Sequence, residues 1–267
     1  MGVPEWPNGI ASRAIGLVPS EVRILAPTLI KMINKILMDE EGRKYYWERG
    51  NLSTHLGLIK EKDIKRKKEV KSNLGKKFIV LDANFIDNLN KIKHSSATTH
   101  LKDVGPILIY SGVGKNSVVL EAGSGSGKLT SLLARFCKRV YSYEKNKNSY
   151  EITKKNLAFL NIKNVKLVNK DVKESKERNL DLVVLDLLDP WNYVNIANKL
   201  LKNSGYLVSY LTNINQVSSL SSNLKKEFIV ERIIEVNERD WISKGLVLRP
   251  EHWGLVHTAF LLFARKR

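Results

Sequence analysis

A glycine-rich turn is the first segment of this sequence whose residue types point to chemistry. Residues 118–128 read VVLEAGSGSGK, with three glycines at alternate positions after an apolar run. Glycines placed there permit a tight turn and let the backbone come close to a ligand. The mononucleotide pattern G-x-x-x-x-G-K-[ST] fails twice, at Ala122 and Leu129. The dinucleotide pattern G-x-G-x-x-G fails because the third glycine comes one residue early.

Two acids stand where neighbouring strands of one sheet would end. Glu144 closes the apolar run that follows the glycines, and Asp171 closes the next one. Glu144 lies roughly 20 residues after the first glycine, a spacing typical of a carboxylate that accepts hydrogen bonds from ribose hydroxyls. Taken alone, Glu144 is equally compatible with an ordinary surface acid. Because ligands collect at the carboxyl ends of parallel strands, the turn and both acids together predict one cofactor crevice.

The pattern of an acid followed by G-x-G-x-G resembles motif I of class I methyltransferases, which use S-adenosylmethionine. The resemblance implies that the turn approaches the methionine part of the cofactor, that Glu144 binds the ribose and that Asp171 binds the adenine amino group. The residues that it places at the cofactor are Glu121, Gly123, Ser124, Gly125, Ser126, Gly127, Glu144, Asp171 and Asp186.

A further apolar run also ends in acids. Residues 183–191 read VVLDLLDPW, which sets Asp186 and Asp189 three positions apart. A carboxylate at the end of so apolar a strand is costly to bury without a partner, and a hydrogen bond from a substrate would provide one. The alternative role is to cap the following helix, with Pro190 as its first residue. We predict capping by Asp189 and catalysis by Asp186.

The elements that must position these residues alternate in type. Apolar runs buried on both faces, alternating with amphipathic segments, predict a parallel sheet with crossover helices. The last two strands have no long helix between them and should pair antiparallel at the sheet edge. The expected strands are 117–122, 139–144, 165–169, 180–187, 205–211, 228–236 and 257–264, and the expected helices are 129–137, 147–160, 194–201 and 216–225. The fold class is therefore α/β and Rossmann-like, with residues 94–267 as the catalytic domain.

A small β domain is expected before it, over residues 32–93. Residues 43–47 and 77–81 have the composition of short strands. Between them lies a charge run, residues 60–68, which we expect to form a loop or hairpin tip. Its charges are equally compatible with a solvated surface and with an RNA contact through Lys65, Arg66, Lys67 and Lys68.

The composition of the chain limits the kinds of molecule that it is expected to bind. The formal net charge is +18, and neutralisation of phosphates by Lys and Arg makes nucleic acid the first partner to consider. A lysine-rich solvated surface is the alternative. Cys137 is the only cysteine, which fits a reducing, cytoplasmic compartment, and the five histidines show no metal-ligand spacing. We therefore expect no metal, and no apolar run has the length of a membrane span.

From about residue 40 to the end, the chain resembles the tRNA 1-methyladenine methyltransferases that act at position 58 of the T-loop, in their archaeal and bacterial form. The resembling stretches are GRKY (42–45), KDVG (102–105), LEAGSGSG (120–127), LDLLDPW (185–191), RPEH (249–252) and HTAF (257–260). The family implies a small N-terminal β domain, a Rossmann-like domain and a homotetramer. It also implies that Asp186 contacts the target adenine of tRNA. Ala97 departs from the family, which usually carries a Gln there, and this puts the cofactor pocket in question.

Several residues are candidates for the RNA substrate. Tyr210, at the end of the fifth strand, is either a stacking partner for the target base or a core aromatic. His252 and His257 either line the pocket or simply pack, and Arg249 is a candidate for a phosphate contact. Two other functions stay open: methyl transfer to another RNA or protein substrate, and a non-catalytic tRNA-binding subunit.

Residues 1–31 differ from the rest, because prolines and glycines interrupt any helical or strand period. A disordered leader is one interpretation. We favour another: residues 20–26 can be back-translated into a DNA segment containing GGTTCGAATCC, which resembles the T-arm of a tRNA gene. We hypothesise that an upstream tRNA gene is translated into this frame and that the native chain starts at Met32. Mass spectrometry of the native protein should then find no peptide from before Met32, and finding one would contradict the hypothesis.

Overall fold

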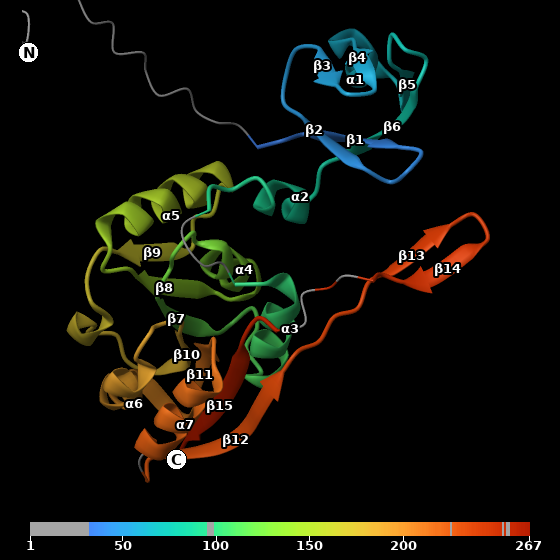
Figure 1. Ribbon diagram of the computed structural model, residues 1–267. Coiled ribbons are helices and arrows are strands. Elements are labelled where there is room, and N and C mark those ends of the chain that lie inside the picture. Colours follow the sequence, from blue (N-terminus) through green and yellow to red (C-terminus); the bar gives the residue numbers. More distant parts are fainter. Residues whose placement is uncertain (1–31, 95–98, 225, 253, 255–256) are drawn as a thin grey trace, which may run out of the picture. The chain divides into compact units, whose positions relative to one another are not determined.

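The computed structural model describes residues 32–94, 99–224, 226–252, 254 and 257–267. Its largest element is a seven-stranded sheet in the order β12-β15-β11-β10-β7-β8-β9 (Figure 1). The five strands from β11 to β9 are parallel, whereas β15 runs antiparallel to both β11 and β12. The strands are β7 (Val118–Ala122), β8 (Arg139–Tyr143), β9 (Val165–Val168), β10 (Leu180–Leu185), β11 (Leu201–Leu211), β12 (Phe228–Glu235) and β15 (Phe260–Lys266).

Helices cover both faces of this sheet. The helices are α3 (Leu101–Tyr110), α4 (Lys128–Phe136), α5 (Lys147–Phe159), α6 (Val194–Leu200) and α7 (Ile214–Asn223). Strand β10 shows why its sequence, after Asp181 near its start, is apolar from Leu182 to its end. Leu182 and Val184 pack with residues of α3 and α4 in one core cluster, while Val183 and Leu185 pack with α6 and α7 in the other. A strand buried on both faces has no position for a polar side chain until it ends.

The predicted α/β architecture is therefore confirmed, including the antiparallel strand pair at the sheet edge. The four predicted helices begin and end within two residues of α4, α5, α6 and α7. Local capping explains part of this agreement. Asn146 and Asn213 accept backbone hydrogen bonds from the first turns of α5 and α7, which fixes where those helices start. Helix α3 and the hairpin of β13 (Trp241–Lys244) and β14 (Val247–Pro250) were not predicted.

The N-terminal segment forms an antiparallel sheet in the order β2-β1-β6-β5, with its own core that includes Leu37, Trp47, Ile59 and Phe78. Its elements are β1 (Lys35–Asp39), β2 (Lys44–Trp47), β3 (Leu52–Thr54), β4 (Gly57–Ile59), α1 (Glu61–Arg66), β5 (Glu69–Lys71), β6 (Lys77–Asp82) and α2 (Phe85–Leu89). The expected small β unit is present.

The charge run at residues 60–68 was wrongly predicted as a loop or hairpin tip, because it contains helix α1. Ile64 is fully buried and anchors the helix in the small core. Ion pairs one turn apart join Lys65 to Glu61 and Lys67 to Asp63, each at 2.8 Å. Such pairs support a short helix, and a single apolar anchor is too little periodicity to show in the sequence.

Candidate active site

The order of the strands places a crevice at one point of the sheet. From β7 the chain moves outward through β8 and β9, and then returns to β10 on the other side of β7. Parallel α/β sheets bind ligands outside the carboxyl ends of the strands at such a reversal. The glycine turn follows β7, and Asp186 follows β10 directly.

The first glycine permits these two segments to touch. Gly123 has φ of +93°, and a Cβ atom built there would lie 2.1 Å from the carbonyl oxygen of Asp186. The Asp186 amide also donates to the carbonyl of Ala122 at 2.9 Å. Any side chain at position 123 would therefore push the turn away from the end of β10.

Helix α5 braces the turn from the other side. The Thr153 hydroxyl donates to the carbonyl of Gly125 at 3.0 Å and shares a hydrogen bond with the Ser124 hydroxyl. The side-chain amide of Asn156 donates to the carbonyl of Ser126 at 2.8 Å. Sequence reasoning missed both residues. The available signal was two polar residues three positions apart on the face of a helix that packs inward, where both are buried.

Glu144 lies just beyond β8, and both of its oxygens are held by backbone. One carboxylate oxygen accepts from the amide of Gly125 at 3.0 Å, and the other accepts from the amide of Asn146 at 2.8 Å. The carboxylate therefore ties the glycine turn to the start of α5, and its remaining lone pairs are available to a ligand.

Asp171 lies three residues beyond the end of β9, at the start of the short 3₁₀ turn η1 (Val172–Glu174). Its Oδ1 accepts from the amide of Lys173 at 2.8 Å, and its Oδ2 accepts from the hydroxyl of Tyr193 at 3.1 Å. The side chain is thus fixed in two directions by neighbouring elements.

The Asp186 carboxyl group has few hydrogen-bond partners among the described residues. Within the described chain, the Thr99 hydroxyl is its one side-chain hydrogen-bond partner, at 3.5 Å. Burial raises the pKa of Asp186 to about 7, and the charge of nearby Glu144 adds to the rise against the opposing effect of Thr99. The side chain is therefore poised between its two protonation states near neutral pH.

Glu121 lies under the turn and not in the pocket wall. It is 1% exposed; Oε2 accepts from the hydroxyls of Thr130 and Ser142, and Oε1 has no hydrogen-bond partner in the part of the chain that the structure describes. Burial raises its pKa to about 8, and the charges of Asp186 and Glu144 contribute to the rise.

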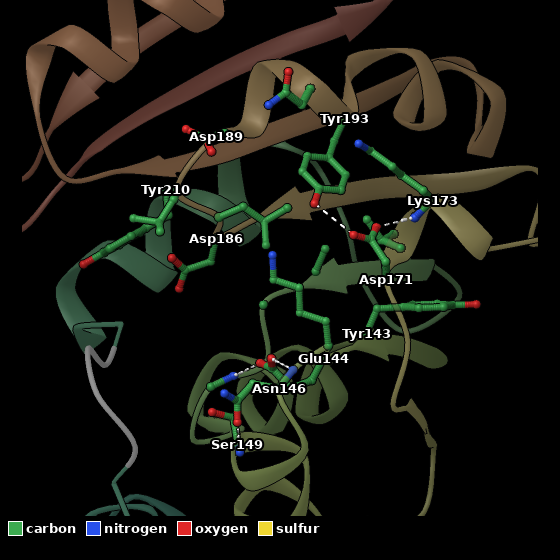
Figure 2. Close-up of a pocket in the computed structure, with 18 of the residues that line it drawn as sticks. Tyr143, Glu144, Asn146, Ser149, Asp171, Lys173, Asp186, Asp189, Tyr193 and Tyr210 are labelled. Atoms are coloured by element: carbon green, nitrogen blue, oxygen red, sulfur yellow. Dashed lines mark hydrogen bonds between the residues drawn. The ribbon is translucent and has the colours of Figure 1, made fainter.

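These residues surround a pocket of about 450 Å³, within the size range of small-molecule sites. Figure 2 shows Glu144, Asp171 and Asp186 arriving from three different strand ends. Five of the predicted cofactor residues line it: Gly123, Gly125, Glu144, Asp171 and Asp186. Glu121, Ser124, Ser126 and Gly127 stand behind this wall. The lining also includes residues that sequence reasoning missed, namely Tyr143, Lys145, Asn146, Ser149, Lys173, Asn192, Tyr193, Thr212 and Gln216.

Asp189 does not cap the following helix, so that prediction was wrong. Its side chain makes no capping hydrogen bond; it is exposed and lines the pocket. The turn that follows is the 3₁₀ turn η2 (Pro190–Tyr193), in which the amide of Asn192 donates to the backbone carbonyl of Asp189. Pro190 has no amide hydrogen, and the backbone carbonyl of Asp189 already accepts from the Asn192 amide, so neither of these two positions uses the Asp189 side chain.

The residues predicted to contact the substrate do not all line this pocket. Tyr210 lines the pocket, is 6% exposed and donates its hydroxyl to Asp103 at 3.0 Å. His252 lies in a second cavity of about 550 Å³ with Lys102 and Lys128. His257 is bonded to Glu235 and to the carbonyl of Thr212.

Basic candidates lie on outer segments. Arg249 is exposed on β14, and Arg66 and Lys68 are exposed at the end of α1. Lys65 and Lys67 are also exposed but are already ion-paired. Ala97 lies outside the described residues. Within the described part of the chain, no group of His, Cys, Asp and Glu is arranged to hold a metal ion, and no helix is long and apolar enough to cross a membrane.

The sheet order, the glycine turn at its reversal and the acids on the neighbouring strand ends define a Rossmann-like, S-adenosylmethionine-dependent methyltransferase. The chain belongs to the family described as tRNA methyltransferase complex GCD14 subunit, whose model matches residues 89–249.

Comparisons with individual proteins agree with this assignment. The chain is 31% identical to the tRNA (adenine(57)-N(1)/adenine(58)-N(1))-methyltransferase TrmI of Methanocaldococcus jannaschii, over 86% of this chain and 94% of that protein. It is 32% identical to the tRNA (adenine(58)-N(1))-methyltransferase TrmI of Thermus thermophilus, over 86% and 96%. Among solved structures, an S-adenosylmethionine-dependent O-methyltransferase of Thermotoga maritima superposes with a TM-score of 0.81 at 26% identity, over 88% of this chain and 92% of that chain. The tRNA (m1A58) methyltransferase TrmI of Aquifex aeolicus superposes with a TM-score of 0.80 at 25% identity, over 89% and 98%.

The close approach at Gly123 yields a direct prediction. Gly123→Ala should lower affinity for S-adenosylmethionine by about tenfold or more, because backbone strain at a positive φ costs about 1–3 kcal/mol and the new Cβ meets the Asp186 carbonyl. Isothermal titration calorimetry would measure this, with circular dichroism to check folding. Gly105→Ala is the matched control, since that glycine lies in α3 with no atom within 4 Å of an added Cβ. Equal affinities of the two variants would show that the turn does not shape the cofactor site.

Proposed function

We propose that this chain transfers the methyl group of S-adenosylmethionine to N1 of the adenine at position 58 in the T-loop of tRNA. The observation that carries the proposal is the position of Asp186, a barely partnered carboxylate at the sheet reversal beside the glycine turn. Membership of a tRNA methyltransferase family and the similarity to the TrmI enzymes support the choice of substrate.

The residues of the pocket fit the cofactor chemically. Glu144 keeps lone pairs free for the two ribose hydroxyls, because its backbone partners already hold the carboxylate in place. Asp171 accepts a hydrogen bond from the adenine amino group of the cofactor. The glycine turn, Gly123 to Gly127 with its serines, lies along the methionine part, and Glu121 lies buried beneath the turn, held by the hydroxyls of Thr130 and Ser142.

When bound, S-adenosylmethionine supplies a methyl group activated by a sulfonium. The target N1 carries a free lone pair near neutral pH, so the protein has little acid–base work to do and acts mainly by positioning. Asp186 accepts a hydrogen bond from the exocyclic amine of the target adenine. As N1 gains its methyl group the ring becomes cationic, and the Asp186 carboxylate stabilises that charge.

Contacts with the rest of the tRNA follow from charge and exposure. A base held in a folded loop has to leave its stack to reach the pocket, and Tyr210 lines the wall that would receive it. The exposed cations available to phosphates are Arg249, Arg66 and Lys68. To bind a phosphate, Lys65 and Lys67 would first have to give up their ion pairs with Glu61 and Asp63. His252 lies in the second cavity and contacts RNA there, and His257 orders the segment before β15 through Glu235.

The assembly and the domains are part of the same proposal. Residues 32–93 form a small β domain and residues 94–267 the catalytic domain. The active protein is a cytoplasmic homotetramer, as the family resemblance implies. Exposed apolar side chains on β12 and the β13–β14 hairpin support an assembly, among them Ile229, Ile233, Trp241, Leu246 and Leu248.

Methyl transfer to defined transcripts tests the proposed function. With labelled S-adenosylmethionine, an unmodified tRNA transcript should be methylated, whereas the same transcript with guanine at position 58 should not. Transfer to both transcripts would keep the methyltransferase and contradict the site. Binding of the cofactor without transfer would indicate another substrate, and absence of binding would favour a non-catalytic subunit.

The role of Asp186 is tested by Asp186→Asn. Turnover with bound tRNA should fall by about 10²–10³-fold, the usual effect of removing one group that stabilises transition-state charge. Asp189→Asn is the matched control, because Asp189 lines the same pocket but is exposed and has no side-chain bond in η2. Single-turnover rates would separate chemistry from binding. Full activity in Asp186→Asn would refute the assigned role.

A further inference from the structure

Three carboxyl groups gather at the glycine turn of this strongly basic chain. Glu121, Glu144 and Asp186 converge on the glycine turn from β7 and from the ends of β8 and β10. None of them forms an ion pair with a Lys, Arg or His of the described chain. We call these residues the carboxylate cluster.

Other charged or titratable groups around the pocket do not neutralise the cluster. These groups are Tyr143, Lys145, Lys170, Asp171, Lys173, Asp189, Tyr193 and Tyr210 in the pocket wall, and His100 in the second cavity. Lys170 is paired with Glu174 at 2.9 Å, and Lys173 lies over the ring of Tyr193. Lys145 is exposed and forms no ion pair with the cluster. The hydroxyls of the three tyrosines donate elsewhere: Tyr143 to Glu177, Tyr193 to Asp171 and Tyr210 to Asp103.

Burial of a carboxyl group away from any cation raises its pKa. The group therefore keeps its proton until a positive charge comes close. Glu121 is the most buried of the three residues, and one of its oxygens has no hydrogen-bond partner among the described residues. Asp186 differs because it also lines the pocket and so can meet a ligand directly. With its pKa raised to about 7, chiefly by burial, Asp186 is protonated in only part of the molecules near neutral pH.

We propose that the carboxylate cluster distinguishes the cationic methyl donor from its neutral product, S-adenosylhomocysteine, through exchange of one proton at Asp186. On binding the sulfonium, the Asp186 carboxyl loses its proton to solvent, and the carboxylate faces the positive charge. After transfer, the positive charge departs on the methylated adenine. The Asp186 carboxylate then takes a proton from solvent, and the product is left in a pocket that no longer attracts it. This inference rests on the proposed cofactor site but not on the RNA substrate.

The sign of the pH dependence follows. Above about pH 7 Asp186 is already ionised and the cation binds at no proton cost, whereas below it each binding event has to expel a proton. Affinity for S-adenosylmethionine should therefore rise about tenfold between pH 6 and pH 8, and that for S-adenosylhomocysteine should change less than about twofold. Near pH 7, binding of the donor should release about half a proton.

Calorimetric titration in buffers of different ionisation enthalpy measures both quantities without RNA. Sinefungin, which carries an ammonium in place of the methylated sulfonium, should behave like the donor. Asp186→Asn should flatten the pH dependence and abolish proton release, while Asp189→Asn should keep both. The comparison of the three ligands on the unaltered protein stands even if a variant fails to fold. Equal proton release with S-adenosylhomocysteine, or retained release in Asp186→Asn, would overturn the proposal. If proton release is specific to the donor but tRNA is not methylated, the proposed substrate is wrong and this inference still holds.

Discussion

The contact between the glycine turn and the end of β10 is the constraint on which the site depends. Gly123 comes so close to the carbonyl of Asp186 that no side chain fits between them, and the Asp186 amide completes the contact through Ala122. Since β7 and β10 are neighbours only because the strand order reverses there, the topology itself brings a ligand-binding turn and an acid together.

Buried polar side chains hold the turn once it is formed. Thr153 and Asn156 bind its carbonyls from α5, and Asn156 also exchanges two hydrogen bonds with the backbone of Lys93. Burying such groups is favourable only when they are fully bonded, so the network demands one geometry. This explains how a turn made of glycine and serine, which has little intrinsic preference, can present a defined surface to a ligand.

Charge acts on two length scales in this protein. The net charge of +18 attracts a polyanion from a distance, while Glu144 and Asp186 line the pocket without an ion pair to a described lysine, arginine or histidine. Desolvation makes the local effect strong, because a buried carboxylate interacts through protein and not through water.

Patterns read along the chain predicted much of the fold. Strands buried on both faces appear as apolar runs, and helices show their own period, so the parallel sheet and its crossover helices could be placed from residues 117–264 alone. The glycine turn, Glu144, Asp171 and Asp186 could be chosen for the same reason: residue type and position at a strand end are local properties. Helix α1 was missed because its one buried side chain, Ile64, leaves no visible period.

Only the tertiary structure decided which partners these residues meet. Thr153 reaches the turn across 28 residues, Tyr193 reaches Asp171 across 22, and Tyr210 reaches Asp103 across 107. Asp189 was expected to cap a helix, yet its side chain makes no capping hydrogen bond and its backbone carbonyl accepts from Asn192 in a 3₁₀ turn. Sequence by itself determined which residue types stand at the strand ends, since these follow from burial and period. Hydrogen-bond partners, burial of the acids and their protonation depend on packing between distant segments, which no local pattern encodes.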